Sequence, residues 1–252
     1  MQVIAHDLVV SYAKKGSGPV AVLLHGWADT QHTFDQLVDQ LQQTYTVVTI
    51  DLAGFGGSQA PPKAWSLTDY AEHVQAVLQK IAIMPNDITL LIGHSNGGAI
   101  AVRAVAKGLL KPKKLVLVAS AGIRQTSLKK SALQSVTKVG KVASIVLPKA
   151  TRHKLRATMY NHVGSDYLIA EHMQGTFKKI VKDDVQADAE QITIPTCIIY
   201  GELDTATPVR YAHIFHSLIH GSSLHVIQNG THFVHQQFSD KVYEYIRRFD
   251  KS

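Results

Sequence analysis

One serine stands in a short glycine-rich segment that suits a catalytic nucleophile. Ser95 lies within Gly93-His94-Ser95-Asn96-Gly97-Gly98, directly after an apolar run at 88–92 and directly before a helical pattern. A nucleophile on a sharp strand-to-helix turn needs small neighbours two residues away, and the helix N-terminus supplies backbone N–H groups near the reacting oxygen. This context predicts that Ser95 is a nucleophile rather than part of a chance Gly-Ser-Gly turn.

Two later segments could supply the groups that activate a serine. Asp204 ends Gly201-Glu202-Leu203-Asp204, which follows the apolar run 196–200, and His232 lies in Gly230-Thr231-His232-Phe233, which follows 224–227. A serine hydroxyl is a weak nucleophile until a base removes its proton. His232 is expected to be that base, and Asp204 is expected to hold its imidazole in the required tautomer.

Other residues remain candidates for the same roles. His235 could replace His232 as the base, and Glu202 could replace Asp204 as the acid, although the Gly-x-x-Asp register favours Asp204. Asp51 lies in a turn, where an aspartate commonly hydrogen-bonds the local backbone. Cys197 falls inside an apolar run, so we expect a buried, small apolar side chain there.

Short apolar runs predict the strands that position these residues. The runs are rich in β-branched residues and do not alternate with polar ones, which is typical of a parallel sheet covered on both faces. They occupy 20–24, 47–50, 88–92, 115–118 and 196–200, with a weaker run at 224–227. Residues 3–4 and 8–12 are expected to form an antiparallel pair before them.

Amphipathic patterns predict helices between these strands. Ser66 is the expected N-cap of a helix over 67–81, and further helices are expected at 97–107, 208–218 and 234–249. The alternation stops between Ala121 and Ile194, where the pattern is mainly helical. A gap too long for a simple crossover indicates an inserted subdomain. We therefore expect a core domain of 1–121 and 191–252 and a helical cap at 122–190, with a merely shielding ornament as the alternative.

Two more motifs give the chain a resemblance to the α/β-hydrolase superfamily that runs nearly from end to end. His25-Gly26-Trp27 follows the run 20–24 and is similar to the oxyanion loop of that family. The segment Asp51-Leu52-Ala53-Gly54-Phe55-Gly56-Gly57-Ser58 resembles the turn after the next strand, with Ala53 in place of the proline often found there. The order serine, aspartate, histidine is also the order of the family.

The resemblance implies both a fold and a site. The fold is the α/β-hydrolase fold, a mostly parallel central sheet of about eight strands flanked by helices, with an inserted helical cap. The backbone N–H groups of Trp27 and Asn96 would form the oxyanion hole. His25, Gly26 and His94 would lie beside the substrate. We expect no cofactor and no metal, because no His, Cys, Asp or Glu group has metal-ligand spacing and no Gly-rich phosphate cradle is present.

These residues predict the reaction class better than the substrate. The expected reaction is hydrolysis of a small carboxylic ester through an acyl-enzyme on a Ser-His-Asp triad. The same residues could serve the hydrolysis of an amide, a thioester or the C–C bond of a diketo acid, since each passes through an oxyanion. A serine nucleophile argues against the dehalogenase and epoxide-hydrolase branches, which use aspartate. A non-catalytic ligand-binding protein with the same fold is a further alternative.

Charge and composition limit the partners. The 252 residues carry a net charge of +7, and 122–190 hold twelve Lys and Arg residues against six Asp and Glu residues. One hypothesis is that this basic insertion favours anionic substrates or contacts anionic lipid surfaces, the alternative being a solvated charged face. Its basic residues include Arg124, Lys129, Lys130, Lys138, Lys141 and Arg152.

Composition also bears on compartment and assembly. With a single cysteine, no signal-peptide pattern and apolar runs far shorter than the roughly 20 residues of a membrane span, we expect a cytoplasmic protein. It is expected to act as a monomer or small homo-oligomer on a small acyl substrate. Nucleic-acid binding is disfavoured because the basic residues are not interleaved with aromatic ones.

Overall fold

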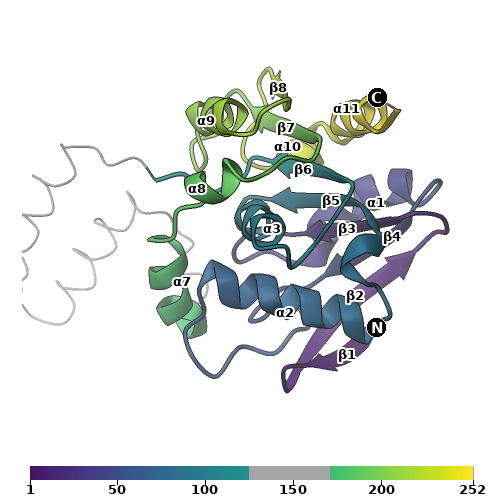
Figure 1. Ribbon diagram of the computed structural model, residues 1–252, viewed down its shortest axis with the longest axis vertical. Helices are drawn as coiled ribbons and strands as arrows, with labels where there is room; N and C mark the ends of the chain where they lie inside the picture. The colour runs from purple at the N-terminus through teal and green to yellow at the C-terminus, as the bar shows by residue number, and fades with distance from the viewer. Residues whose placement is uncertain (125–170, 252) are drawn as a thin grey trace, which may run out of the picture. The chain divides into compact units, whose positions relative to one another are not determined.

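The computed structural model describes residues 1–124 and 171–251, which build an eight-stranded sheet (Figure 1). The sheet order is β1-β2-β4-β3-β5-β6-β7-β8. β1 and β2 pair antiparallel, β2 pairs antiparallel with β4, and the remaining neighbours are parallel. The strands are β1 (Gln2–Ala5), β2 (Leu8–Lys15), β3 (Val20–Leu24), β4 (Thr46–Ile50), β5 (Ile88–His94), β6 (Lys114–Val118), β7 (Thr196–Gly201) and β8 (Ser223–Ile227). The predicted α/β-hydrolase sheet and its antiparallel opening pair are confirmed.

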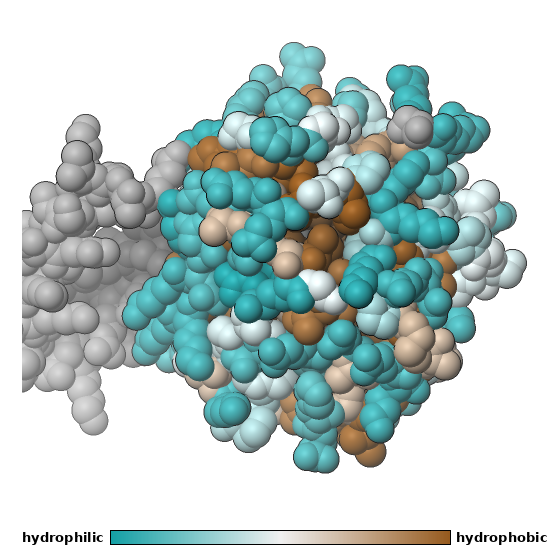
Figure 2. Space-filling model, viewed as in Figure 1, coloured by the Kyte–Doolittle hydropathy of each residue, from teal (hydrophilic) through white to brown (hydrophobic). Residues whose placement is uncertain are grey.

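Helices cover both faces of this sheet. One layer contains α2, α3, α8 and α9, and the other contains α1, α10 and α11 (Figure 1). The described helices are α1 (Asp35–Leu41), α2 (Leu67–Lys80), α3 (Asn96–Ala106), α7 (Gln174–Ile180), α8 (Gln186–Ala189), α9 (Arg210–Leu218), α10 (Val234–Gln237) and α11 (Ser239–Lys251). Because both faces are covered, every residue of β7 is buried, which explains why its sequence lacks alternation. The face drawn in Figure 2 is mostly hydrophilic, and hydrophobic residues show between the helices.

Local signals explain where some helices begin and end. α2 begins after Ser66, whose hydroxyl accepts the Asp69 N–H while the Asp69 carboxylate accepts the Ser66 N–H, so the predicted cap is confirmed as a capping box. The single helix expected over 234–249 is wrong. The backbone leaves the helical region at Phe238 (φ −132°, ψ 45°), whose side chain packs against the core, and the chain forms α10 and α11 instead.

The segment that leads back from the expected insertion packs with the sheet. The compact unit around the sheet comprises Met1–Ile123 and His172–Ser252, so it includes α7 and α8, which the sequence pattern assigns to the cap. Arg103 of α3 explains this packing, since its Nε donates to Asp188 Oδ2 at 2.7 Å. Asp183 Oδ2 also accepts the Leu67 N–H at the start of α2.

The rest of the expected cap, 125–170, lies outside the described residues, and with it lie the basic side chains of Lys129, Lys130, Lys138, Lys141 and Arg152. In the part of the chain that is described, no helix combines the length and the apolar character that a membrane crossing requires.

Candidate active site

Ser95 occupies a strained turn between β5 and α3. Its φ of 51° and ψ of −117° place a residue with a side chain in a region that costs of order 1–3 kcal/mol. Two backbone hydrogen bonds hold this conformation: the Ser95 N–H donates to Val118 O at 3.1 Å, and the Ala121 N–H donates to Ser95 O at 2.9 Å. The end of β6 therefore fixes the turn that presents the Ser95 side chain, which is partly exposed.

The glycines around Ser95 let backbone segments approach more closely than any side chain permits. A Cβ on Gly97 would lie 2.1 Å from Leu24 O, and one on Gly93 would lie 2.5 Å from Gly98 Cα. A Cβ on Gly98 would meet the Ser120 side chain at 2.4 Å. The glycine spacing of the sequence motif is thus explained by contacts of the turn with β3 and with the chain after β6.

The loop after β3 lies directly against the nucleophile. A Cβ on Gly26 would lie 3.2 Å from Ser95 Cβ, so this loop and the Ser95 turn are in van der Waals contact. The Trp27 ring packs edge-on against Phe55, with centroids 4.8 Å apart, and lies 5.2 Å from the Phe177 ring of α7. Of the two predicted oxyanion donors, Trp27 follows Gly26 in this loop, and Asn96 follows Ser95 at the first position of α3. At that position a helix offers the N–H no internal partner.

His25 organises this loop through its ring nitrogens. Nε2 accepts the Leu52 N–H at 2.8 Å, so the proton is on Nδ1, which donates to Gly26 O at 2.7 Å. Burial lowers the pKa of His25 and keeps the ring neutral. Asp51 is likewise bound to backbone, since its carboxylate accepts the N–H groups of Gln31 and Gly57, as its turn position predicts.

The structure brings Asp204 and His232 together at the ends of β7 and β8. His232 Nδ1 lies 2.9 Å from Asp204 Oδ2, and the Asp204 side chain is fully buried whereas the His232 side chain is 19% exposed. Asp204 Oδ1 accepts the N–H groups of Ala206 and Thr207 at 2.9 and 2.8 Å. Because Nδ1 donates to the carboxylate, Nε2 of His232 is left as the basic nitrogen.

The alternative acid and base lie elsewhere. The Glu202 side chain accepts the Asn229 N–H at 3.1 Å, so it is Asp204 that lies against His232. His235 is 1% exposed, and its Nε2 lies 2.9 Å from Thr33 Oγ1 near the start of α1. Burial and the neighbouring His232 lower the pKa of His235 to about 3.

His94 connects the nucleophile turn to the base. Its Nε2 donates to the backbone oxygen of His232 at 3.0 Å, and its ring lies 4.9 Å from the His232 ring and 4.2 Å from the His235 ring. Burial, with His235 next to it, lowers the pKa of His94 well below its usual value. A neutral imidazole pair thus packs beside His232. In the described part of the chain, Ser95 Oγ itself makes no hydrogen bond, a common state of catalytic groups without substrate.

The sequence motifs did not predict two residues of the site. Thr207 contacts both Asp204 and His232, and Phe177 packs on Trp27. The start of a turn at Asp204 is the signal that could have indicated Thr207, because aspartate side chains commonly accept N–H groups two or three residues ahead. Phe177 has no such local signal, since its partner is 150 residues away along the chain.

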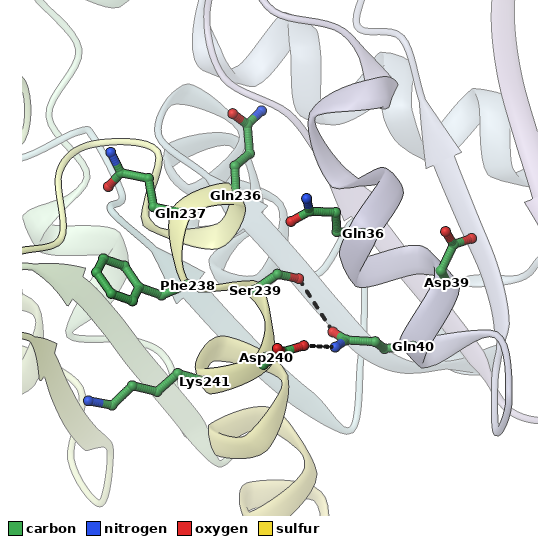
Figure 3. Close-up of a pocket in the computed structure, with 9 residues that line it drawn as sticks. All are labelled: Gln36, Asp39, Gln40, Gln236, Gln237, Phe238, Ser239, Asp240 and Lys241. Atoms are coloured by element: carbon green, nitrogen blue, oxygen red, sulfur yellow. Dashed lines mark hydrogen bonds between the residues drawn. The ribbon is translucent and has the colours of Figure 1, made fainter.

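Other features do not add chemistry to this site. Among residues 1–124 and 171–251, no three His, Cys, Asp or Glu side chains are placed to hold a metal ion. Cys197 is buried in β7, where burial raises the pKa of its thiol to about 11. A surface hollow of about 610 Å³ lies between α1 and the α10–α11 region (Figure 3). Its lining is mostly Gln, Asp and Ser, with Gln40 donating to Asp240 across it.

Comparisons with known proteins identify the family of the chain. Residues 18–237 match the family described as "Serine aminopeptidase, S33". The chain belongs to this family. It is 26% identical to the pimeloyl-(acyl-carrier protein) methyl ester esterase of Aliivibrio salmonicida, over 93% of each chain. It is also 26% identical to an uncharacterized protein of Mycobacterium tuberculosis, over 93% of this chain and 76% of the other.

Solved structures share the fold of this serine aminopeptidase family member. The enol-lactonase from Burkholderia xenovorans superposes with a TM-score of 0.75 at 16% identity, over the full length of both chains. An esterase from Exiguobacterium antarcticum gives a TM-score of 0.74 at 22% identity, over 100% of this chain and 99% of the other. The protein is therefore an α/β-hydrolase, and it is a serine hydrolase.

Proposed function

We propose that the protein hydrolyses small carboxylic esters through an acyl-enzyme formed on Ser95. The observation that carries this proposal is the hydrogen bond from His232 Nδ1 to the buried Asp204 carboxylate. The strained turn of Ser95 is linked to this pair by its neighbour His94, whose Nε2 donates to His232 O. A buried carboxylate bonded to Nδ1 fixes the imidazole tautomer and stabilises the cation that forms when the ring takes a proton. A binding protein has no need for this arrangement.

The reaction runs through two similar halves. His232 Nε2 takes the Ser95 proton as Oγ attacks the ester carbonyl, and the carbonyl oxygen becomes an anion held by the N–H groups of Trp27 and Asn96. The proton then passes from His232 to the departing alcohol as the acyl-enzyme forms. In the second half His232 activates water, which releases the acid and restores Ser95. Each oxyanion donor contributes about two to three orders of magnitude in rate.

The choice of an ester over other acyl compounds is supported by named relatives. The Aliivibrio salmonicida relative is an esterase by name and is similar over nearly its whole length. A second candidate is amide hydrolysis, which the description of the family names and which the same triad supports. An amide has a poorer leaving group that His232 must protonate. Amide hydrolysis therefore depends more strongly on the position of the imidazole than ester hydrolysis does.

A fluorophosphonate probe tests the nucleophile, because it labels activated serines. The protein should react at Ser95, Ser95→Ala should abolish labelling while remaining folded, and Ser217→Ala should label like the wild type because it changes an exposed serine on α9. A folded wild-type protein that stays unlabelled would overturn the proposal.

A substrate panel tests the bond that is cleaved. We expect p-nitrophenyl esters of short acyl chains to be hydrolysed, with activity falling along the series to long chains, and p-nitroanilides to be turned over far more slowly. Faster anilide than ester hydrolysis would instead identify an amidase on the same triad. Measuring an anionic ester at several ionic strengths tests whether the basic insertion favours anionic substrates. If it does, hydrolysis of this ester should slow as salt is added, because salt screens long-range attraction.

A further inference from the structure

The Thr207 hydroxyl lies between the acid and the base of the proposed triad. Its Oγ1 is 2.8 Å from Asp204 Oδ2 and 3.2 Å from His232 Nδ1. A third neighbour, Ala119 O at the end of β6, lies 2.9 Å away. The residue is 5% exposed, so these contacts are made without water as a competitor.

A proton count assigns the direction of each bond. A threonine hydroxyl has one proton to donate and two lone pairs that accept. Ala119 O and the Asp204 carboxylate only accept, and His232 Nδ1 carries a proton because it donates to Asp204. The distances of 2.8 Å to Asp204 Oδ2 and 2.9 Å to Ala119 O both suit donation, and the ionised carboxylate is the stronger acceptor, so the resting hydroxyl donates to Asp204 Oδ2. Its lone pairs then face the His232 N–H.

We propose that Thr207 is a positioning residue that holds the Asp204 carboxylate and the His232 imidazole in register during catalysis. This inference rests on the proposed function, since it requires His232 to be the base. When His232 takes the serine proton, the cationic ring draws more strongly on Asp204 Oδ2. The Thr207 hydroxyl keeps donating to Oδ2, whose second lone pair accepts the N–H of the imidazolium. No covalent bond to Thr207 changes.

The hydroxyl acts separately from the turn that carries it. The backbone N–H groups of Ala206 and Thr207 already hold Asp204 Oδ1, and a substitution at the side chain leaves them in place. Only Oδ2, the oxygen that faces His232, depends on the hydroxyl. Thr207→Val therefore removes one hydrogen-bonding group at nearly constant shape, and Thr207→Ser retains that group.

The test measures kcat and KM with p-nitrophenyl butyrate. We expect Thr207→Val to lower kcat about tenfold with KM changed by less than about twofold, because the hydroxyl acts on the transition state rather than on substrate binding. Thr207→Ser should stay within about threefold of the wild type. Thr196→Val is the matched control, since Thr196 is 1% exposed at the opposite end of β7 and its hydroxyl bonds only local backbone. If Thr207→Val does not fold, Thr207→Ala is measured against the same expectation.

A double-mutant cycle separates positioning from general structural damage. In an Asp204→Ala background there is no carboxylate to hold, so adding Thr207→Val should change kcat by less than about twofold. A wild-type kcat for Thr207→Val, no recovery in Thr207→Ser, or an equal loss in the Asp204→Ala background would each overturn the inference. Failure of the proposed function has a different signature, because Ser95→Ala would then retain activity or probe labelling.

Discussion

The two halves of the active site are held in different ways. The Ser95 turn is fixed by two backbone hydrogen bonds and by backbone segments packed against Gly93 and Gly97, where an added Cβ has no room. The loop of Gly26 packs against the side chains of His94 and Ser95. The loops of Asp204 and His232 also approach closely, since a Cβ on Gly201 would lie 2.4 Å from Gly230 O. The Asp204 and His232 side chains, however, are held by hydrogen bonds, among them those of Thr207. We therefore expect the first half to be most sensitive to atoms added at its glycines, and the second half to be most sensitive to the removal of a polar group beside its catalytic side chains.

The largest expected effect comes from adding a methyl group to the first half. In Gly97→Ala the new Cβ would lie 2.1 Å from Leu24 O and 2.5 Å from His25 O, and neither backbone segment can move without shifting β3. We expect the free energy of unfolding to fall by about 3 kcal/mol and esterase activity to be lost, because overpacking of this kind displaces the backbone. Urea unfolding and an ester assay measure the two effects.

Gly108→Ala is the control for this change. Nothing lies within 4 Å of a Cβ at Gly108, whose φ is +67°, so the substitution costs only backbone strain of about 1 kcal/mol. If Gly97→Ala and Gly108→Ala lost equal amounts of stability and activity, the close backbone approach at Gly97 would not be what holds the first half.

The same contrast explains what the sequence could predict. Ser95 and its glycines form a local motif that is visible within a few residues, although two of these glycines are required by contacts with β3 and with the chain after β6. Asp204 and His232 could be predicted because parallel strands end at one edge of the sheet, so residues that follow the ends of β7 and β8 meet there.

Contacts that depend on side-chain packing could not be predicted in this way. The position of the Thr207 hydroxyl depends on how the turn after Asp204 packs against Ala119. Helical periodicity does not indicate where the insertion ends, because it is the same in α7 and α8 whether they cover the sheet or form a separate unit. The break at Phe238 had no glycine or proline to indicate it.

The second half is expected to show its dependence on polar groups through pH. The pKa of His235 is lowered to about 3 by burial, against about 6.5 in the unfolded chain. The unfolded state therefore binds one more proton than the folded state over this interval. Stability from His235 is fully present above about pH 6.5 and falls by about 1.4 kcal/mol for each unit that the pH drops toward 3. His235→Gln removes this contribution, so the free energy of unfolding should fall less between pH 6.5 and 4.5 than in the wild type, by about 2 kcal/mol.

Urea unfolding at several pH values measures this slope. His213→Gln is the matched control, because it makes the same change at an exposed position on α9 and should follow the wild-type dependence on pH. An unchanged slope in His235→Gln would show that the buried imidazole beside His94 is not what makes the second half sensitive to acid.

The smallest expected effect tests whether the first half depends on packed side chains as well as on backbone. Phe177 of α7 contacts the Trp27 ring from a segment that follows the insertion, whereas Phe55 contacts the same ring from the loop after β4. Phe177→Leu should lower the free energy of unfolding by about 1 kcal/mol, which is the value of one aromatic pair. It should also lower kcat about threefold, because the backbone N–H of Trp27 is then held less firmly at the oxyanion. Phe215→Leu is the control, since Phe215 is fully buried in α9 and contributes stability without contact to the oxyanion loop. If both variants are less stable but kcat falls only in Phe177→Leu, the oxyanion loop depends on a side chain of α7. If kcat falls in neither variant, the close contacts of Gly26 and Gly97 position the loop without Phe177.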